Sequence, residues 1–346
     1  MTRRHSVAVL ALFATLAQAC SSETVAMWPA PPVHFMADAA VASAPSPVTP
    51  TDKERSLAEA YLKALSSSGF VDLAAIVDEQ ARVTLGARNT HGRERVIQIH
   101  EQTFGAFDQR HFVTNRVWLT DSTRPLDSQA FEWTMTGVQA RDWMGIAPTL
   151  KPVVIKGLTL LWSNDNGVIS DMHVYFDEGL VRAQLGSGPA ELQKLPAPSA
   201  DAGTHDVFER TGAPEEKANV EVVRSMIQAL EDDKEADFLS TMDDEVQVFT
   251  SDHAEPARGK NTARQYFHLL RGSIHHLDTV VENAWGAGSF AVVEYAITGL
   301  QQAPLPRVPF AAGRPLHTQF VDVAELKGGR MVRIWRYADP IAFAAM

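Results

Sequence analysis

An internal duplication is the feature of this 346-residue chain that most constrains its fold. Residues 131–137 read FEWTMTG and residues 293–299 read VEYAITG, so the two segments match in their aromatic, acidic and glycine positions. The glycine that ends each segment is followed 40 positions later by an aspartate, Asp177 in the first case and Asp339 in the second. Matched chemistry at a matched spacing predicts two copies of one folding unit.

The same order of predicted elements recurs in both copies. Apolar residues at helical spacing predict an opening helix, which a short second helix and a strand follow. These elements are expected at residues 57–65 and 220–230, 72–77 and 236–242, and 81–85 and 246–250. Hairpins of two long strands are expected at residues 153–163 with 168–176, and at 318–326 with 331–337. The order predicts an α+β fold in each copy.

Two stretches of distinct composition set the predicted boundaries. Residues 20–50 are rich in proline and alanine, which favours an extended tether over a packed core. Residues 187–215 are rich in proline and glycine, and their composition is that of a linker. A first domain is therefore expected at 51–186 and a second at 216–346.

The N-terminus predicts export. Two arginines, Arg3 and Arg4, precede an apolar run at 7–17, and a small-residue segment ending at Cys20 follows. This arrangement is typical of a signal peptide at 1–19, and the segment before Cys20 resembles a bacterial lipobox. Lipidation of Cys20 would attach the chain to a membrane of the bacterial cell envelope. Cleavage by ordinary signal peptidase, giving a secreted protein, is the alternative.

Composition narrows the function classes. The formal net charge of −11 argues against nucleic acid as a partner, because a phosphate backbone repels an acidic protein. Cys20 is the only cysteine, so no intrachain disulfide can form. No metal-ligand motif and no glycine-rich phosphate loop is present in the sequence, and neither a metal nor a cofactor is predicted.

Two short motifs give the first copy a family resemblance. Tyr175-Phe176-Asp177 closes its last strand, and Gly145-Ile146-Ala147-Pro148-Thr149 precedes its long hairpin. With the order of elements, these motifs resemble the SnoaL-like polyketide cyclase family of the nuclear transport factor 2-like fold, over residues 51–186 and 216–346. The resemblance implies two tandem cone-shaped domains, each with helices on a curved antiparallel sheet and a pocket at the open end. It also implies that the two domains pair as a pseudo-dimer through their sheets.

The last strand of each copy carries the candidate site. Strand alternation places His173, Tyr175 and Asp177 on one face in the first copy, and Trp335, Tyr337 and Asp339 on one face in the second. If that face lines the pocket, the resemblance makes Asp177 and Asp339 the acid or base and their neighbours the ligand contacts. The alternative is that each aspartate caps the segment that follows it.

Matched residues on an earlier strand are further candidates. Trp133 and Tyr295 are expected to contact an apolar ligand. Glu132 and Glu294 precede them, and alternation leaves open whether these carboxylates face the pocket or the solvent. The solvent is favoured.

His317 and Gln319 are expected to form a polar wall of the second pocket. The first copy has Ile155 and Gly157 at what we take to be the matched positions. If the chain is catalytic, the second copy is therefore the expected location of the active pocket.

Three function classes follow. The favoured one is a membrane-anchored lipoprotein without catalytic activity that binds a small apolar ligand or a partner. The second is an enzyme of cyclase, isomerase or dehydratase type that uses a pocket aspartate. The third is a structural or assembly module. The known members of the fold include both catalytic and binding domains, so the fold alone does not choose between them.

Overall fold

The computed structural model describes residues 52–86, 88–120, 128–188, 206–250, 255–306, 308 and 311–338. The predicted signal peptide and tether, Cys20 and Asp339 lie outside these residues. The described residues belong to one compact unit. None of their helices is long and apolar enough to cross a membrane.

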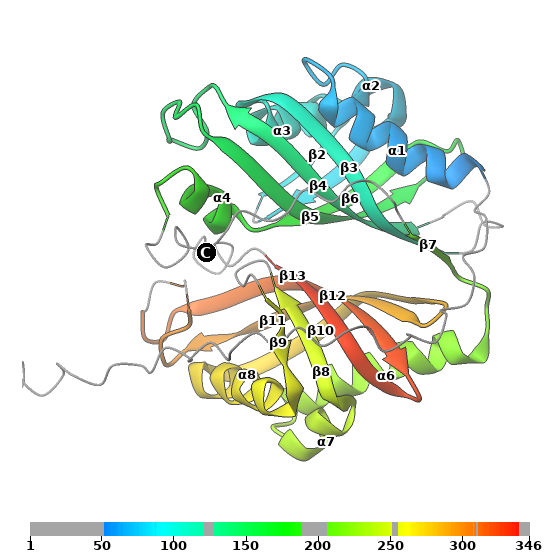
Figure 1. Cartoon of the computed structure of the whole chain (residues 1–346), viewed down its shortest axis with the longest axis vertical. Coiled ribbons are helices and arrows are strands. Elements are labelled where there is room, and N and C mark those ends of the chain that lie inside the picture. The colour runs from blue at the N-terminus through cyan, green and yellow to red at the C-terminus, as the bar shows by residue number, and fades with distance from the viewer. Residues whose placement is uncertain are drawn as a thin grey trace, which may run out of the picture. The chain divides into compact units, whose positions relative to one another are not determined.

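The first repeat combines four helices with six strands (Figure 1). Its helices are α1 (Asp52–Ser66), α2 (Leu73–Ile76), α3 (Arg93–Phe104) and α4 (Glu178–Gln184). Its strands are β1 (Val77–Leu85), β2 (Arg88–His91), β3 (Phe107–Leu119), β4 (Ser128–Gln139), β5 (Pro152–Ser163) and β6 (Ile169–Phe176).

The second repeat follows the same plan. Its helices are α6 (Pro214–Glu231), α7 (Glu235–Ser240) and α8 (Gly259–Ser273). Its strands are β8 (Met242–Thr250), β9 (Ala257–Arg258), β10 (Ile274–Ala287), β11 (Phe290–Gln301), β12 (Pro315–Lys327) and β13 (Arg330–Ala338). The predicted helices and hairpins therefore occur in both repeats, with bounds that differ by a few residues.

Both sheets have one strand order. It is β2-β1-β6-β5-β4-β3 in the first repeat and β9-β8-β13-β12-β11-β10 in the second. The sheets are mixed, because β1 runs parallel to β6 and β8 runs parallel to β13, while the other pairs within these two series are antiparallel. The fold class is α+β, as predicted. Each sheet was expected to be antiparallel, but each contains one parallel pair of strands.

Part of the predicted linker is a strand. β7 (Asp206–Glu209) pairs in parallel with β3 and extends the first sheet to seven strands. Val207 is buried, and the ring of Phe208 stacks on Trp118 with centroids 6.1 Å apart. Burial of Val207 and the packing of the partly buried Phe208 hold a segment whose composition alone is typical of a loop.

Each sheet has an inner face, which helices cover (Figure 1), and an outer face. On the inner face of the first sheet, Trp133 and Phe176 join one apolar cluster with Tyr61 of α1. On the inner face of the second sheet, Tyr295 joins a cluster with Phe267 of α8. A third cluster contains outer-face residues of both sheets, including Trp118, Leu158, Tyr175, Trp285, Val321 and Val323.

Candidate functional site

A buried polar network lies on the inner face of the second sheet. Arg336 of β13 donates hydrogen bonds from Nε and Nη2 to the two carboxylate oxygens of Asp322 on β12, at 2.8 and 2.6 Å. Tyr295 of β11 donates its hydroxyl to Oδ2 of Asp322 at 3.1 Å. The side chain of Asp322 is fully buried, and that of Arg336 is 9% exposed. We call Tyr295, Asp322 and Arg336 the inner-face network.

Aromatic rings flank the inner-face network. Tyr295 stacks on Phe320, with ring centroids 5.4 Å apart and planes at 17°. The guanidinium of Arg336 lies 4.4 Å from the ring centroid of Tyr266 on α8, in cation–π geometry. Tyr266 and Arg336 are both only partly buried, so the network extends from a closed interior toward the surface.

The pKa values of Arg336 and Tyr295 are both raised. Burial lowers the pKa of Arg336, but the charge of Asp322 outweighs this effect and raises that pKa well above its usual range. Burial also raises the pKa of Tyr295 well above its usual range. Arg336 is therefore a cation and Tyr295 a neutral donor at physiological pH.

The first repeat has no such ion pair at the matched positions. Trp133 pairs with Gly157 in the first sheet as Tyr295 pairs with Phe320 in the second. This register matches Thr159 with Asp322. Trp133 donates its indole N–H to the Thr159 hydroxyl at 3.0 Å, as Tyr295 donates to Asp322.

The Trp133 ring lies over Gly157, the counterpart of Phe320. A Cβ atom on Gly157 would lie 2.2 Å from this ring, so only glycine fits beneath it. The rings of Phe112, Phe104 and Phe176 lie 5.4, 6.0 and 6.4 Å from Trp133. The inner face of the first sheet is thus filled by aromatic side chains.

The register also corrects an assumption about His317 and Gln319. The expected match with Ile155 and Gly157 is wrong, because Gly157 pairs with Trp133 as Phe320 pairs with Tyr295, which shifts the match by one residue. Their counterparts are therefore Val154 and Lys156, not the residues assumed.

His100 is a second buried polar group, in the first repeat. His100 lies on α3 and is fully buried. Its Nδ1 lies 2.7 Å from the Val96 carbonyl and its Nε2 lies 2.8 Å from the Tyr61 hydroxyl. Nδ1 therefore carries the proton, and Nε2 accepts from Tyr61. Burial lowers the pKa of His100 to about 4.

Glu132 and Glu294 are buried on the outer faces. Their exposed fractions are 7% and 0%, so the favoured prediction that they face solvent is wrong. Each accepts a hydrogen bond from a tyrosine of the other repeat: Tyr337 donates to Glu132, and Tyr175 donates to Glu294. Burial and the nearby glutamate raise the pKa of both tyrosines well above their usual range.

The two glutamates differ in their other partners. Arg116 donates two hydrogen bonds to Glu132, both at 2.9 Å. Glu294 instead accepts from Asn283 at 2.5 Å and contacts His173 at 2.6 Å. Burial lowers the pKa of His173, but the hydrogen bond and charge of Glu294 outweigh it and raise that pKa.

The structure divides the predicted ligand contacts between two faces. Trp133 and Tyr295 lie on the inner faces, in the two helix-covered clusters. The others lie on outer faces, since they alternate with inner-face residues: His173, Tyr175, His317, Gln319, Trp335 and Tyr337.

Asp177 and Asp339, the residues predicted to act as acid or base, belong to neither set of predicted ligand contacts. Asp177 is 3% exposed and caps α4, accepting a hydrogen bond from the Leu180 N–H at 2.9 Å. This is the capping geometry we held as the alternative for it. Asp339 lies outside the described residues.

Asp322 and Arg336 are the residues that sequence analysis missed. Asp322 stands in the run Phe-Val-Asp-Val-Ala, where a charged residue interrupts an apolar strand. Arg336 stands between Trp335 and Tyr337 in the final strand. A charge inside a buried strand needs a partner, and that rule links the two residues once the strands are known to pair.

Comparisons with known proteins agree with this fold. Residues 223–334 match the family model described as "SnoaL-like domain". The second repeat therefore contains a SnoaL-like domain. A search of curated proteins finds no match.

Several solved structures are similar to about one third of the chain. A candidate SnoaL-like polyketide cyclase from Jannaschia sp. CCS1 is 24% identical, with coverage of 39% of this chain and 96% of its own and a TM-score of 0.35. An LEH-like epoxide hydrolase from M. tuberculosis is 15% identical over 38% and 89%, with a TM-score of 0.31. TsrD from Streptomyces laurentii is 16% identical over 36% and 91%, with a TM-score of 0.33.

Among the described residues, no group of three or more histidine, cysteine, aspartate or glutamate side chains has the geometry to hold a metal ion.

Proposed function

We propose that this chain is an envelope-anchored protein that binds a small, largely apolar ligand at the inner face of its second repeat without transforming it. The observation that supports this proposal is the inner-face network of Tyr295, Asp322 and Arg336. Its aromatic flanks suit the apolar body of a ligand, and Arg336 suits a carbonyl or hydroxyl oxygen at the ligand's polar end.

The energetics of buried ion pairs favour a binding role for the network. Removing two charges from water costs about as much as their attraction returns, so a well-packed apolar replacement is often equally stable. The first repeat illustrates the alternative, with Thr159 in place of Asp322 beneath an aromatic donor. The fold therefore does not require the pair, which leaves a role in ligand binding open to it.

The same geometry argues against Asp322 as a general base. Its two oxygens already accept two hydrogen bonds from Arg336 and one from Tyr295. A general base must reach the proton it removes, and these three contacts already direct both oxygens toward Arg336 and Tyr295. A cyclase, isomerase or dehydratase activity that uses Asp339 or Asp177 as acid or base is the alternative function.

Anchoring at Cys20 is the second part of the proposal. The lipobox-like segment before Cys20 supports it, with the tether at 20–50 holding the folded repeats away from the membrane. Intact mass of the chain purified from bacterial membranes tests it. A diacylglycerol-sized mass on the peptide that begins at Cys20 is expected, and an unmodified peptide beginning there would contradict lipidation.

Ligand binding is tested with native mass spectrometry and thermal shift on the purified chain. The probes are progesterone, 1,8-dihydroxyanthraquinone and palmitate. At least one probe should bind and raise the melting temperature, and the double variant Asp322→Asn/Arg336→Met should lose that shift. Gln319→Ala is the matched control, because Gln319 lies on the outer face of the same strand and bonds to Glu282.

The outcomes separate the function classes. Binding that survives the double variant, or that is lost in Gln319→Ala, would contradict the inner-face site. Conversion of a bound probe to a product would favour the enzyme alternative. Absence of binding by every probe would favour the third class, an assembly module, for which the contacts of Tyr175 and Tyr337 with glutamates of the other repeat are the supporting observation.

A further inference from the structure

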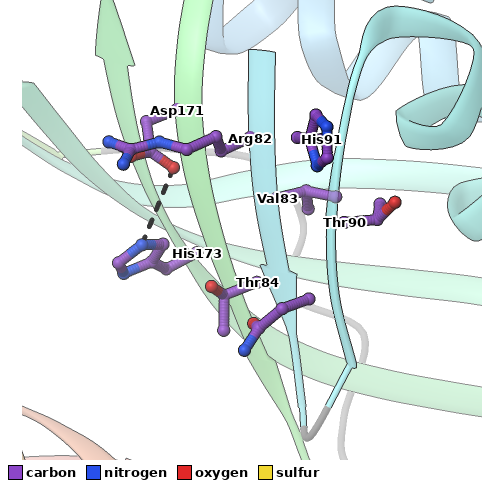
Figure 2. A pocket seen from close by; sticks show the side chains of 8 residues that line it. Arg82, Val83, Thr84, Thr90, His91, Asp171 and His173 are labelled. Carbon is purple, nitrogen blue, oxygen red and sulfur yellow. Dashed lines mark hydrogen bonds and ion pairs between the residues drawn. The ribbon is translucent and has the colours of Figure 1, made fainter. Parts of the chain in front are cut away.

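An open groove of about 360 Å³ lies on the outer face of the first sheet (Figure 2). Strands β1, β2 and β6 line it. The side chains that matter for its chemistry are Arg82, Thr84, Asn89, His91, Asp171 and His173. This groove is distinct from the inner-face network, which lies in the other repeat and on the other face of its sheet.

The second repeat shows what the groove replaces. Thr84 pairs with His173 in the first sheet, and Phe249 pairs with Trp335 at the matched place in the second. Phe249 and Trp335 stack with centroids 5.2 Å apart and planes at 11°. Smaller polar residues at both positions therefore leave space in the first repeat where the second has an aromatic stack.

Donors and acceptors converge on this space. Arg82 donates to Asp171 at 2.5 Å, yet its side chain is 73% exposed. His173 lies 3.7 Å from Asp171 through Nε2, while its Nδ1 contacts Glu294 at 2.6 Å. Figure 2 shows Arg82 and Asp171 side by side above His173, with Thr84 below on the neighbouring strand.

The charges of the groove balance. Arg82 forms an ion pair with Asp171, and Nδ1 of His173 contacts Glu294 behind it. A balanced set gives no net attraction for an ion, but it offers donors and acceptors in fixed directions. Such a set matches neighbouring hydroxyl groups, each of which donates one hydrogen bond and accepts others.

We propose that the outer-face groove of the first repeat binds a small uncharged polyhydroxylated ligand, a monosaccharide or the terminal unit of a glycan. Asp171 accepts from one hydroxyl of the ligand, and Arg82 donates to the next. Asn89 on β2, which pairs with Thr84, supplies an amide. The volume is at the lower end of the range for ligand pockets, which fits a single sugar ring.

The test uses saturation-transfer NMR and calorimetry on the purified chain. Its probes are glucose, galactose, mannose and N-acetylglucosamine, each compared with its methyl glycoside, and gluconate and inorganic phosphate serve as charged comparators. At least one sugar should bind. Methyl glycosides that bind as well as the free sugars indicate a glycan end, and weaker ones indicate a free monosaccharide.

Two variants localise the binding. Thr84→Phe fills the groove with the residue type that the second repeat has at the matched position, Phe249. Arg82→Gln removes the charged donor without filling space. Each should weaken sugar binding by at least about tenfold. Gln247→Ala, at the position in the second repeat that matches Arg82, should leave it unchanged. Circular dichroism and melting temperature check that each variant folds.

The proposal would be overturned by any of three results. These are the absence of sugar binding, full binding by the folded Thr84→Phe variant, and tighter binding of gluconate or phosphate than of every sugar. Asp322→Asn/Arg336→Met should not change sugar binding, and Thr84→Phe should not change binding of the apolar probes. Failure of one site is therefore distinguishable from failure of the other.

Discussion

In the first repeat, Trp133 covers Gly157 and donates to Thr159; in the second, Tyr295 stacks on Phe320 and donates to Asp322. The strand order around both sets is the same. One backbone plan therefore accepts either an aromatic filling or a buried ion pair on its inner face. The difference lies in the side chains, and it is the reason we propose a ligand site in the second repeat.

On the outer faces the roles are reversed: the second repeat carries the aromatic side chains and the first carries the polar ones. In the second repeat, Phe249 and Trp335 stack at the edge of the sheet, whereas the first repeat has Thr84 and His173 there and an open groove. On each face, one repeat is thus filled by aromatic side chains at the place where the other repeat carries polar groups. This pattern is expected of a duplicated unit whose copies have acquired separate tasks.

The largest expected effect comes from breaking the inner-face ion pair. Arg336→Met leaves Asp322 charged and buried, and it should lower the free energy of unfolding by about 3–5 kcal/mol. Asp322→Asn/Arg336→Met should recover much of that loss, because no unpaired charge remains. Urea unfolding followed by fluorescence measures both variants. Equal losses in the single and double variants would mean that the charges are not coupled.

Acid should weaken the first repeat through His100. Its folded pKa of about 4 lies below the unfolded value, so the unfolded state binds the proton first. The contribution of His100 is complete above about pH 6.5 and disappears as pH falls toward 4, a loss of about 3 kcal/mol. Urea unfolding across this range measures it. His100→Gln should flatten the pH dependence; an unchanged slope would show that other groups cause it.

The two tyrosine–glutamate contacts between the repeats should contribute about equally to the free energy of unfolding. Tyr175→Phe leaves Glu294 without one donor, and Tyr337→Phe does the same to Glu132. Each variant should lose about 1.5–3 kcal/mol, the usual contribution of a hydrogen bond to a charged group. Double-mutant cycles with Glu294→Gln and Glu132→Gln measure the coupling. A coupling near zero in either cycle would show that this contact does not hold the repeats together.

The smallest expected effect tests the filled inner face of the first repeat. Gly157→Ala places a methyl group against the Trp133 ring and should cost about 1–3 kcal/mol. Gly272→Ala is the control, because its Cβ meets nothing within 4 Å and the residue lies in α8. The control should be neutral or slightly stabilising. Melting temperatures compare them, and a neutral Gly157→Ala would mean that the ring moves freely.

Much of the fold followed from local sequence. Helical spacing predicted α1 and α6, and turn residues predicted the hairpins β5–β6 and β12–β13. β7 was missed, because its burial depends on Trp118, which lies far away in the sequence. The parallel pairing of the first and last strands likewise depends on long-range contacts that a local pattern does not encode.

The candidate site was harder to predict. Alternation correctly grouped His173 with Tyr175, but it does not tell which of the two faces the helices will cover. The predicted face turned out to be the outer one in both repeats. Asp322 was overlooked for a related reason: without the β12–β13 register, nothing in the sequence connects it with Arg336.

Hydrogen–deuterium exchange of the chain, with and without the apolar probe that raises its melting temperature, tests the central claim most directly. Binding at the inner face of the second repeat should slow exchange in β11, β12 and β13 and leave β4, β5 and β6 unchanged. The double variant Asp322→Asn/Arg336→Met should show no protection. Protection confined to the first repeat, or retained in the double variant, would contradict the assignment of the ligand site to the inner face of the second repeat.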